Sequence, residues 1–334
     1  MGGGRRGNAG CDWRHGVARR TQNPTRTLAV LVAASGLVAC ARPAAEPPVT
    51  EGLLPVNGTE LYVKRVGSGD PIVVVHGGPV LEHGYLLPHL QPLAKTHQLI
   101  FFDQRLSGRS AGQVDSASVR LATFVEDIEA LRLSLGLDRM VLLGHSWGGL
   151  LALEYAIRHG RRLTALILLD PMPPSTSLWQ KEEAILATRI TAEDSLDLAA
   201  LRATEAFANR DPQAVEQALR ISFRPQFHNR ALVGDLKLYV PEDYGERSRQ
   251  FGYMLADLMD FDLLDSLTVV NMPTLILYGS DEPAAELSGA ALAARIPHAR
   301  LVTIGGAGHF PFIEQPSAFL ATVRAFLDEA GAPH

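Results

Sequence analysis

Short apolar runs separated by amphipathic or polar stretches recur along most of the chain. Residues 72–75 and 99–102 contain no polar side chain, which is typical of strands that are covered on both faces of a sheet. Two shorter strands are predicted before them, and the Asn57-Gly58 pair that joins these two is a strong hairpin signal. These two strands cover residues 53–56 and 59–66. The other predicted strands cover residues 139–143, 164–169, 274–278 and 300–304.

Amphipathic segments between the strands predict helices. Over residues 123–136, apolar side chains share one helical face, and Thr123 and Glu126 have the spacing of a capping box. Residues 150–158 predict a second helix that ends before Gly160 as a C′ residue. The alternation of strands and helices predicts an α/β fold with a doubly wound, mostly parallel sheet.

The strand signal vanishes between residues 171 and 265, where the sequence becomes helical and polar. The helices expected there cover residues 178–190, 195–209 and 214–221. An insertion of this length after the sixth predicted strand is interpreted as a helical cap over a binding site. The alternative is an excursion that only stabilises the fold. The predicted domains are a core of residues 51–170 and 266–334 and a cap of residues 171–265.

Residues 1–39 have the features of an export signal. Arginines precede the apolar run 28–39, which is too short to span a bilayer stably. The run ends in Leu37-Val38-Ala39-Cys40, which resembles the lipobox of bacterial lipoproteins. The resemblance implies a lipidated Cys40, a flexible tether over 40–50, and anchoring to the periplasmic or extracellular face of a bacterial membrane. The alternative is an ordinary signal peptide that ends near a cysteine.

Composition narrows the class of protein. A chain of 334 residues with 46% hydrophobic content can bury a large core and an insertion. The net charge of −5 shows no basic excess, so no nucleic-acid partner is expected. Cys11 would be removed with the signal, so no disulfide is expected. The sequence has no metal-ligand spacing and no cofactor fingerprint, so neither a metal nor a cofactor is expected, and the oligomeric state stays open.

The most informative motif runs from Gly144 to Gly148, with Ser146 at its centre, and it lies between a predicted strand and a predicted helix. This G-x-S-x-G spacing predicts a nucleophile elbow, in which the two glycines let a strained turn close. The serine hydroxyl is expected to project above the sheet at a helix N-terminus, where developing negative charge is favoured. We therefore expect Ser146 to be a catalytic nucleophile.

Two further segments are expected at the same site. Gly77 and Gly78 follow a predicted strand, and one of their N–H groups is expected to form an oxyanion hole with the N–H of Trp147. His309 lies on a glycine-rich loop after the last predicted strand, and it is the expected general base.

Three motifs, in this order and spacing, resemble those of the α/β-hydrolase fold and of its proline-iminopeptidase-like branch. They are HGGP at 76–79, FDQR at 102–105 and GHSWGG at 144–149. The similarity covers residues 55–325, apart from most of the cap. Val80 and Leu106 depart from the pattern, because the family usually carries glycine at both positions. The side chains expected to brace the loops beside the site are His76, Asp103, Gln104, Arg105 and His145.

The triad acid has three candidates. Asp281 and Glu282 both follow a predicted strand, and each carboxylate could accept the second ring N–H of a histidine. The resemblance places the acid three residues after Gly279, which favours Glu282. Asp170, at the end of strand 164–169, occupies the position at which some relatives carry their acid.

The resemblance implies a serine hydrolase that removes an N-terminal proline or a similar residue from a small-molecule or short-peptide substrate through an acyl-enzyme. The acidic cap residues that could bind the free amine are Glu182, Glu183, Glu205 and Glu216. A carboxylesterase acting on small acyl esters is the alternative, because the same chemistry serves both. An inactive binding lipoprotein on the same fold is an alternative of another class, and the intact Ser146 and His309 oppose it.

Overall fold

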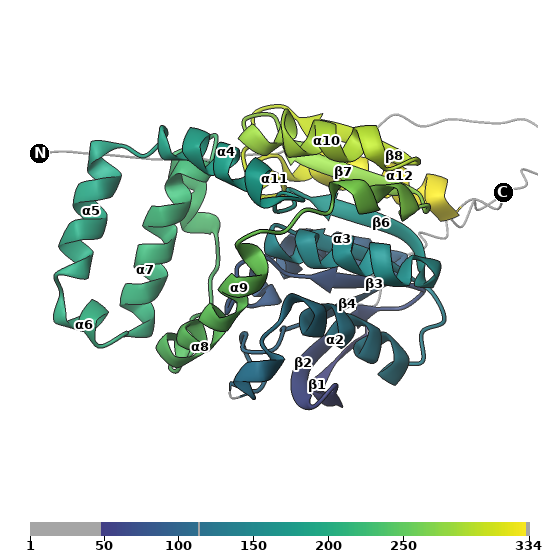
Figure 1. Cartoon of the computed structure of the whole chain (residues 1–334), viewed down its shortest axis with the longest axis horizontal. Coiled ribbons are helices and arrows are strands. Elements are labelled where there is room, and N and C mark those ends of the chain that lie inside the picture. Colours follow the sequence, from purple (N-terminus) through teal and green to yellow (C-terminus); the bar gives the residue numbers. More distant parts are fainter. Residues whose placement is uncertain (1–47, 113, 332–334) are drawn as a thin grey trace, which may run out of the picture. The chain divides into compact units, whose positions relative to one another are not determined.

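A computed structural model describes residues 48–112 and 114–331 (Figure 1). Its centre is an eight-stranded sheet in the order β1-β2-β4-β3-β5-β6-β7-β8. The pairs β1-β2 and β2-β4 are antiparallel, and all the others are parallel. The strands are β1 (Val49–Val56), β2 (Thr59–Gly67), β3 (Asp70–Val75), β4 (His97–Phe102), β5 (Met140–His145), β6 (Leu163–Leu169), β7 (Thr274–Gly279) and β8 (Ala299–Ile304). The predicted doubly wound, mostly parallel sheet is confirmed.

The first hairpin forms where the sequence predicts it. Val56 pairs with Thr59, so Asn57 and Gly58 are the only two turn residues, and both have positive φ angles, 44° and 77°. The strand that leads into this turn begins at Val49, earlier than the predicted start of the fold at residue 51, because its first residues also find partners on β2. The predicted signal, Cys40 and most of the predicted tether lie outside the described residues.

Helices cover both faces of the sheet (Figure 1). Alternate strand residues enter two separate apolar cores: Val73 and Val75 pack on the side of α2 and α3, whereas Ile72 and Val74 pack on the side of α1 and α12. The helices of the core are α1 (Leu87–Leu90), α2 (Leu121–Ser134), α3 (Trp147–His159), α10 (Ser288–Arg295), α11 (Pro311–Glu314) and α12 (Pro316–Gly331).

Two helix ends differ from the prediction. Helix α2 begins at Leu121, so Thr123 lies inside its first turn and forms no capping box. The backbone N–H of Leu121 instead donates to the Asp257 carboxylate at 2.8 Å, a partner 136 residues away that local spacing could not indicate. Helix α3 ends at His159, and Gly160 keeps a right-handed conformation with φ −52°, so it is not a left-handed C′ residue.

The segment between β6 and β7 is a helical cap, as predicted. Figure 1 shows α5, α6 and α7 extending beyond the sheet. The predicted helix 195–209 is divided, because Thr204 caps a new helix through its hydroxyl. The cap helices are α4 (Thr176–Ala187), α5 (Ala192–Arg202), α6 (Glu205–Ala208), α7 (Pro212–Phe223), α8 (Tyr244–Phe251) and α9 (Leu255–Leu258). Across the described ranges 48–112 and 114–331, no helix combines the length and apolar character needed to cross a membrane.

Candidate active site

Ser146 occupies a strained turn between β5 and α3. Its φ and ψ angles are 55° and −122°, a combination that few residues other than glycine adopt. A Cβ at Gly144 would collide with the carbonyl oxygen of Gly148, and one at Gly148 would collide with that of Val75. The two glycines of the motif are therefore required for the strand, the turn and the helix to pack this closely. This is the geometry of a nucleophile elbow.

His309 and Glu282 reach the same site from the loops after β8 and β7. The ring Nδ1 of His309 lies 3.4 Å from a carboxylate oxygen of Glu282. Ser146, His309 and Glu282 all line one cavity. Of the two neighbouring acids, Glu282 thus lies beside the histidine. Asp281 is half-exposed and pairs with His228 at 2.5 Å.

Asp170, the third candidate, also lies at this position. It follows β6 with a φ angle of 41° and is fully buried. One of its oxygens accepts a hydrogen bond from the Gly279 N–H at 3.1 Å. Asp170 lines the cavity with Glu282 and His309, so two carboxyl groups face one imidazole.

The histidine loop is held by contacts that the motifs do not indicate. The His309 N–H donates to the Gln226 carbonyl at 2.8 Å, and the Gly308 N–H donates to the Glu314 carboxylate at 2.7 Å. Glu314 also accepts the N–H of Asn229 at 2.7 Å. The cap segment that follows α7 and the last residue of α11 therefore fix the loop that carries the expected base.

Gly77 and Gly78 differ in what their N–H groups can do. The Gly77 N–H donates to the Tyr85 hydroxyl at 2.7 Å, so it is already satisfied. The Tyr85 hydroxyl lies 2.6 Å from His145 Nδ1, and the other ring nitrogen of His145 lies 3.2 Å from the His309 carbonyl oxygen. Burial keeps the pKa of His145 well below its usual value, so the neutral ring accepts at Nδ1 and donates at Nε2. Of the two glycines, Gly78 is the better partner for the Trp147 N–H in an oxyanion hole.

Each residue of the Asp103-Gln104-Arg105 motif contacts a different element. Gln104 donates to the His76 carbonyl at 2.7 Å and accepts from the indole of Trp147 at 2.8 Å. Arg105 makes a buried two-point ion pair with Asp127 of α2. His76 accepts the Gln104 N–H at 3.2 Å, and burial lowers its pKa to about 4, so this ring is neutral. These contacts fix the loops on both sides of Ser146.

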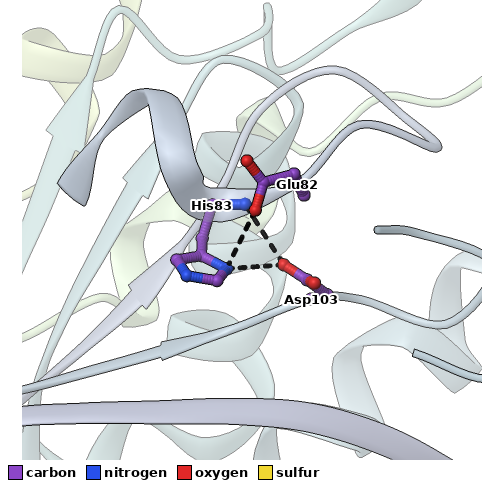
Figure 2. A group of neighbouring side chains, drawn as sticks. All are labelled: Glu82, His83 and Asp103. Carbon is purple, nitrogen blue, oxygen red and sulfur yellow. Dashed lines mark hydrogen bonds and ion pairs between the residues drawn. The ribbon is translucent and has the colours of Figure 1, made fainter. Parts of the chain in front are cut away.

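Figure 2 shows how Asp103 holds the loop after the glycine pair. The ring of His83 donates to one Asp103 oxygen at 2.6 Å, and the Arg109 N–H donates to the other at 2.8 Å. A carboxylate oxygen of Glu82 faces the same ring nitrogen, 3.6 Å from Nδ1. Burial raises the pKa of the Glu82 carboxyl above its usual value.

Two clusters bring possible metal-ligating atoms within 4.8 Å of one another: Glu82, His83 and Asp103, and Asp170, Glu282 and His309. In the first, Asp103 already accepts hydrogen bonds at both oxygens. The second lines the cavity beside Ser146, where an imidazole is needed as a base. The second cluster therefore fits a proton-transfer role directly.

The cavity has a volume of about 460 Å³ and lies between the sheet edge and the cap. Its cap wall is mainly apolar, with two carboxylates, Glu182 and Glu183. Glu182 accepts hydrogen bonds from the N–H and the hydroxyl of Ser288, and burial raises its pKa to about 7. The main apolar side chains of the cap wall are Trp179, Leu219, Phe223, Phe251, Leu255 and Leu258.

Comparison with known proteins identifies the family. The alpha/beta hydrolase fold pattern matches residues 70–316, and the chain belongs to this family. The proline iminopeptidase of Lactobacillus delbrueckii subsp. bulgaricus is 29% identical over 287 residues, which are 81% of this chain and 95% of the relative. The resemblance drawn from the three motifs is thereby confirmed.

Solved structures agree with this assignment. A proline iminopeptidase-related protein from Thermus thermophilus is 26% identical, with a TM-score of 0.63 over 84% of this chain and 98% of that one. A thermophilic esterase from Thermogutta terrifontis shares the fold at 22% identity, with a TM-score of 0.62 over 85% of this chain and 100% of that one.

Proposed function

We propose that the chain is a serine aminopeptidase of the proline-iminopeptidase type, which hydrolyses the bond after an N-terminal proline or a similar residue. The observation that carries the proposal is the single cavity that joins Ser146, His309 and Glu282 to two carboxylates of the cap. The relatives named proline iminopeptidase support the same substrate class.

The residues of the site suffice for acyl transfer. His309 takes the proton of the Ser146 hydroxyl, whose oxygen attacks the scissile carbonyl carbon. The N–H groups of Gly78 and Trp147 stabilise the oxyanion, and Glu282 stabilises the imidazolium. His309 then protonates the leaving amine. In the second half of the reaction, His309 takes a proton from water, the water oxygen attacks the acyl carbonyl carbon, and the proton passes to the Ser146 oxygen as the acid leaves.

The free amine of the substrate distinguishes an aminopeptidase from other acyl-transfer enzymes. Glu182 and Glu183 are the candidates for binding it, because both line the cavity. A cation beside Glu182 would favour the ionised form of a carboxyl whose pKa burial has raised. The other two acids named from the sequence are not placed to do so: Glu205 is exposed on α6, and Glu216 pairs with Arg220 at 2.6 Å.

A carboxylesterase is the second candidate. The apolar side chains of the cap wall favour it, because an acyl chain needs no charged partner in the cavity. The two activities therefore differ in whether the cap carboxylates contribute to binding.

The purified protein should be tested side by side on proline nitroanilide, the same compound acetylated on its nitrogen, and short-chain nitrophenyl esters. An aminopeptidase is expected to prefer the free proline compound, to lose most activity on the acetylated one, and to show a raised KM after Glu183→Gln. Rapid ester hydrolysis with no turnover of proline nitroanilide would instead establish the esterase.

We further propose that Cys40 is lipidated and holds the enzyme on the outer side of a bacterial membrane. The apolar run 28–39 followed by Leu37-Val38-Ala39-Cys40 supports this. Cys40→Ser should move the protein from the membrane fraction to a soluble or unprocessed form, with the mature N-terminus identified by mass spectrometry. Equal soluble fractions for both versions would contradict the anchor.

A further inference from the structure

Two carboxyl groups, from different strands, compete for one position beside His309. A carboxylate oxygen of Asp170, one of Glu282 and a ring nitrogen of His309 all lie within 4.8 Å of one another. A triad requires one acid at this position. The second carboxyl therefore needs a role of its own.

Each carboxyl keeps one buried oxygen that forms no hydrogen bond. The Oδ2 atom of Asp170 and the Oε2 atom of Glu282 are both buried and form no hydrogen bond within the described residues, although Glu282 Oε2 lies 3.4 Å from His309 Nδ1. Asp170 cannot turn away, because its N–H donates to the Leu277 carbonyl at 2.7 Å and its Oδ1 accepts from Gly279. An unsatisfied buried polar atom is costly, and a proton shared between the two carboxyls would give Asp170 Oδ2 the partner that it lacks.

Two ionised carboxylates at this distance would repel each other strongly in a buried site. The other titratable groups near Asp170 are Glu314 and Tyr278, and neither supplies positive charge to offset a second anion. Burial first, and then the charge of Glu282, raise the pKa of Asp170 well above its usual value. His309 can balance one negative charge when it is protonated, and one only.

Resting on the acyl-transfer mechanism proposed above, we propose that Asp170 is a neutral partner of Glu282 and a reserve triad acid. Its Oδ2 carries the proton and donates it in a hydrogen bond to Glu282, so the pair bears a single negative charge that faces His309. When Glu282 cannot ionise, Asp170 releases this proton to solvent, and its carboxylate accepts the imidazole N–H instead.

A double-mutant cycle over Asp170→Asn and Glu282→Gln tests the reserve role. The readout is the rate of Ser146 labelling by a fluorophosphonate, together with kcat/KM for a nitrophenyl ester. We expect a loss of about 5-fold for Asp170→Asn, because the amide can still donate, and about 100-fold for Glu282→Gln. The double variant should lose about 10⁴-fold, which is the cost of a missing triad acid. This loss is much larger than the product of the two single losses, about 500-fold.

Asp281→Asn is the matched control, since Asp281 adjoins Glu282 but pairs with His228. Its effect should simply multiply with that of Glu282→Gln. A loss of about 10⁴-fold from Glu282→Gln alone, with nothing added by Asp170→Asn, would overturn the reserve role. A loss of that size from Asp170→Asn alone would make Asp170 the ionised acid and would overturn it equally.

Infrared spectroscopy tests the proton directly and needs no turnover. Protein labelled with carboxyl-¹³C aspartate should show, at pH 7, a carboxylic-acid C=O band that shifts in D₂O and disappears in Asp170→Asn. Absence of the band would refute a neutral Asp170. Failure of the proposed function would show separately, as a wild-type protein that leaves proline nitroanilide intact whether or not the band is present.

Discussion

The carboxyl ends of the central strands, called the sheet edge below, and the cap that faces them hold their side chains in different ways. At the sheet edge, Ser146 and Asp170 have positive φ angles, and their N–H groups donate to the carbonyls of Leu169 and Leu277. The backbone itself therefore aims these side chains. In the cap, Glu182 is held through Ser288, and apolar side chains such as Leu196 and Met259 remain 70% and 71% exposed.

This difference assigns the chemistry and the selectivity to different regions. Bond breaking needs groups held within a fraction of an ångström, which a strained and buried backbone provides. Substrate choice needs a wall that can vary without disturbing the nucleophile, and helices joined by loops provide it. Substitutions at the sheet edge should therefore change kcat, and substitutions in the cap should change KM.

The largest effect is expected from Ser146→Ala. Loss of the nucleophile should lower turnover by about 10⁵-fold or more, while the fold stays intact, because the hydroxyl makes little contribution to packing. Steady-state rates and circular dichroism measure the two. Activity within about tenfold of the wild type would remove Ser146 from the mechanism and with it the contrast between the regions.

Among the residues that only support the site, Tyr85→Phe should have the largest effect. It removes the hydroxyl between the Gly77 N–H and His145, so a buried N–H loses its partner, which costs about 1–3 kcal/mol of unfolding free energy. We expect kcat to fall about 10- to 100-fold with KM nearly unchanged, because the oxyanion loop and the His309 carbonyl lose a shared support. A raised KM with normal kcat would show that this contact acts on binding instead.

The features at the carboxyl ends of the strands can be predicted from the sequence because their residues belong to local motifs. The glycine spacing around Ser146 indicates the elbow, and the loop after the last strand indicates His309. Val80 and Leu106, which replace glycines of the family pattern, still adopt positive φ angles of 69° and 63°. Both are buried, so apolar burial offsets the strain of a left-handed residue.

Most of the contacts that the sequence did not indicate join residues far apart in the chain. Tyr85 lies in no motif, and only the fold brings its hydroxyl to His145. The same is true of Gln226, whose carbonyl fixes the His309 loop, and of Ser288, which holds Glu182. A backbone carbonyl has no signature in a sequence, so such partners could not be found before the fold was known.

Glu182→Gln tests the cap. The amide keeps an acceptor for Ser288 but lacks the charge for an ammonium group, so KM for proline nitroanilide should rise about tenfold while kcat and ester hydrolysis change little. A fall in kcat on both substrates would instead place Glu182 with the sheet edge.

The stability of the same variant should depend on pH. The folded pKa of Glu182, about 7, lies above the unfolded value of 4.5, so the wild type loses stability as the pH rises from about 4.5 through 7. Relative to the wild type, Glu182→Gln should gain about 1–3 kcal/mol between pH 5 and pH 8. Urea unfolding of both proteins at the two pH values measures this. Parallel stabilities across the range would mean that Glu182 is ionised without penalty in the folded state.

The smallest effect is expected from Asp257→Ala, at a contact between the two regions. Asp257 lies on α9 of the cap, and its carboxylate accepts the Leu121 N–H at the start of α2. Its loss should cost about 1 kcal/mol of unfolding free energy, because a cap on a half-buried helix end is replaced by water.

The neighbours of Asp257, Leu255 and Leu258, line the cavity, so KM reports whether α9 has moved. We expect KM and kcat to change less than twofold, and Asp257→Asn, which keeps an acceptor oxygen, to retain most of the stability. A large rise in KM for the alanine variant alone would mean that this hydrogen bond positions the cavity wall, and that the cap depends on the core for its selectivity.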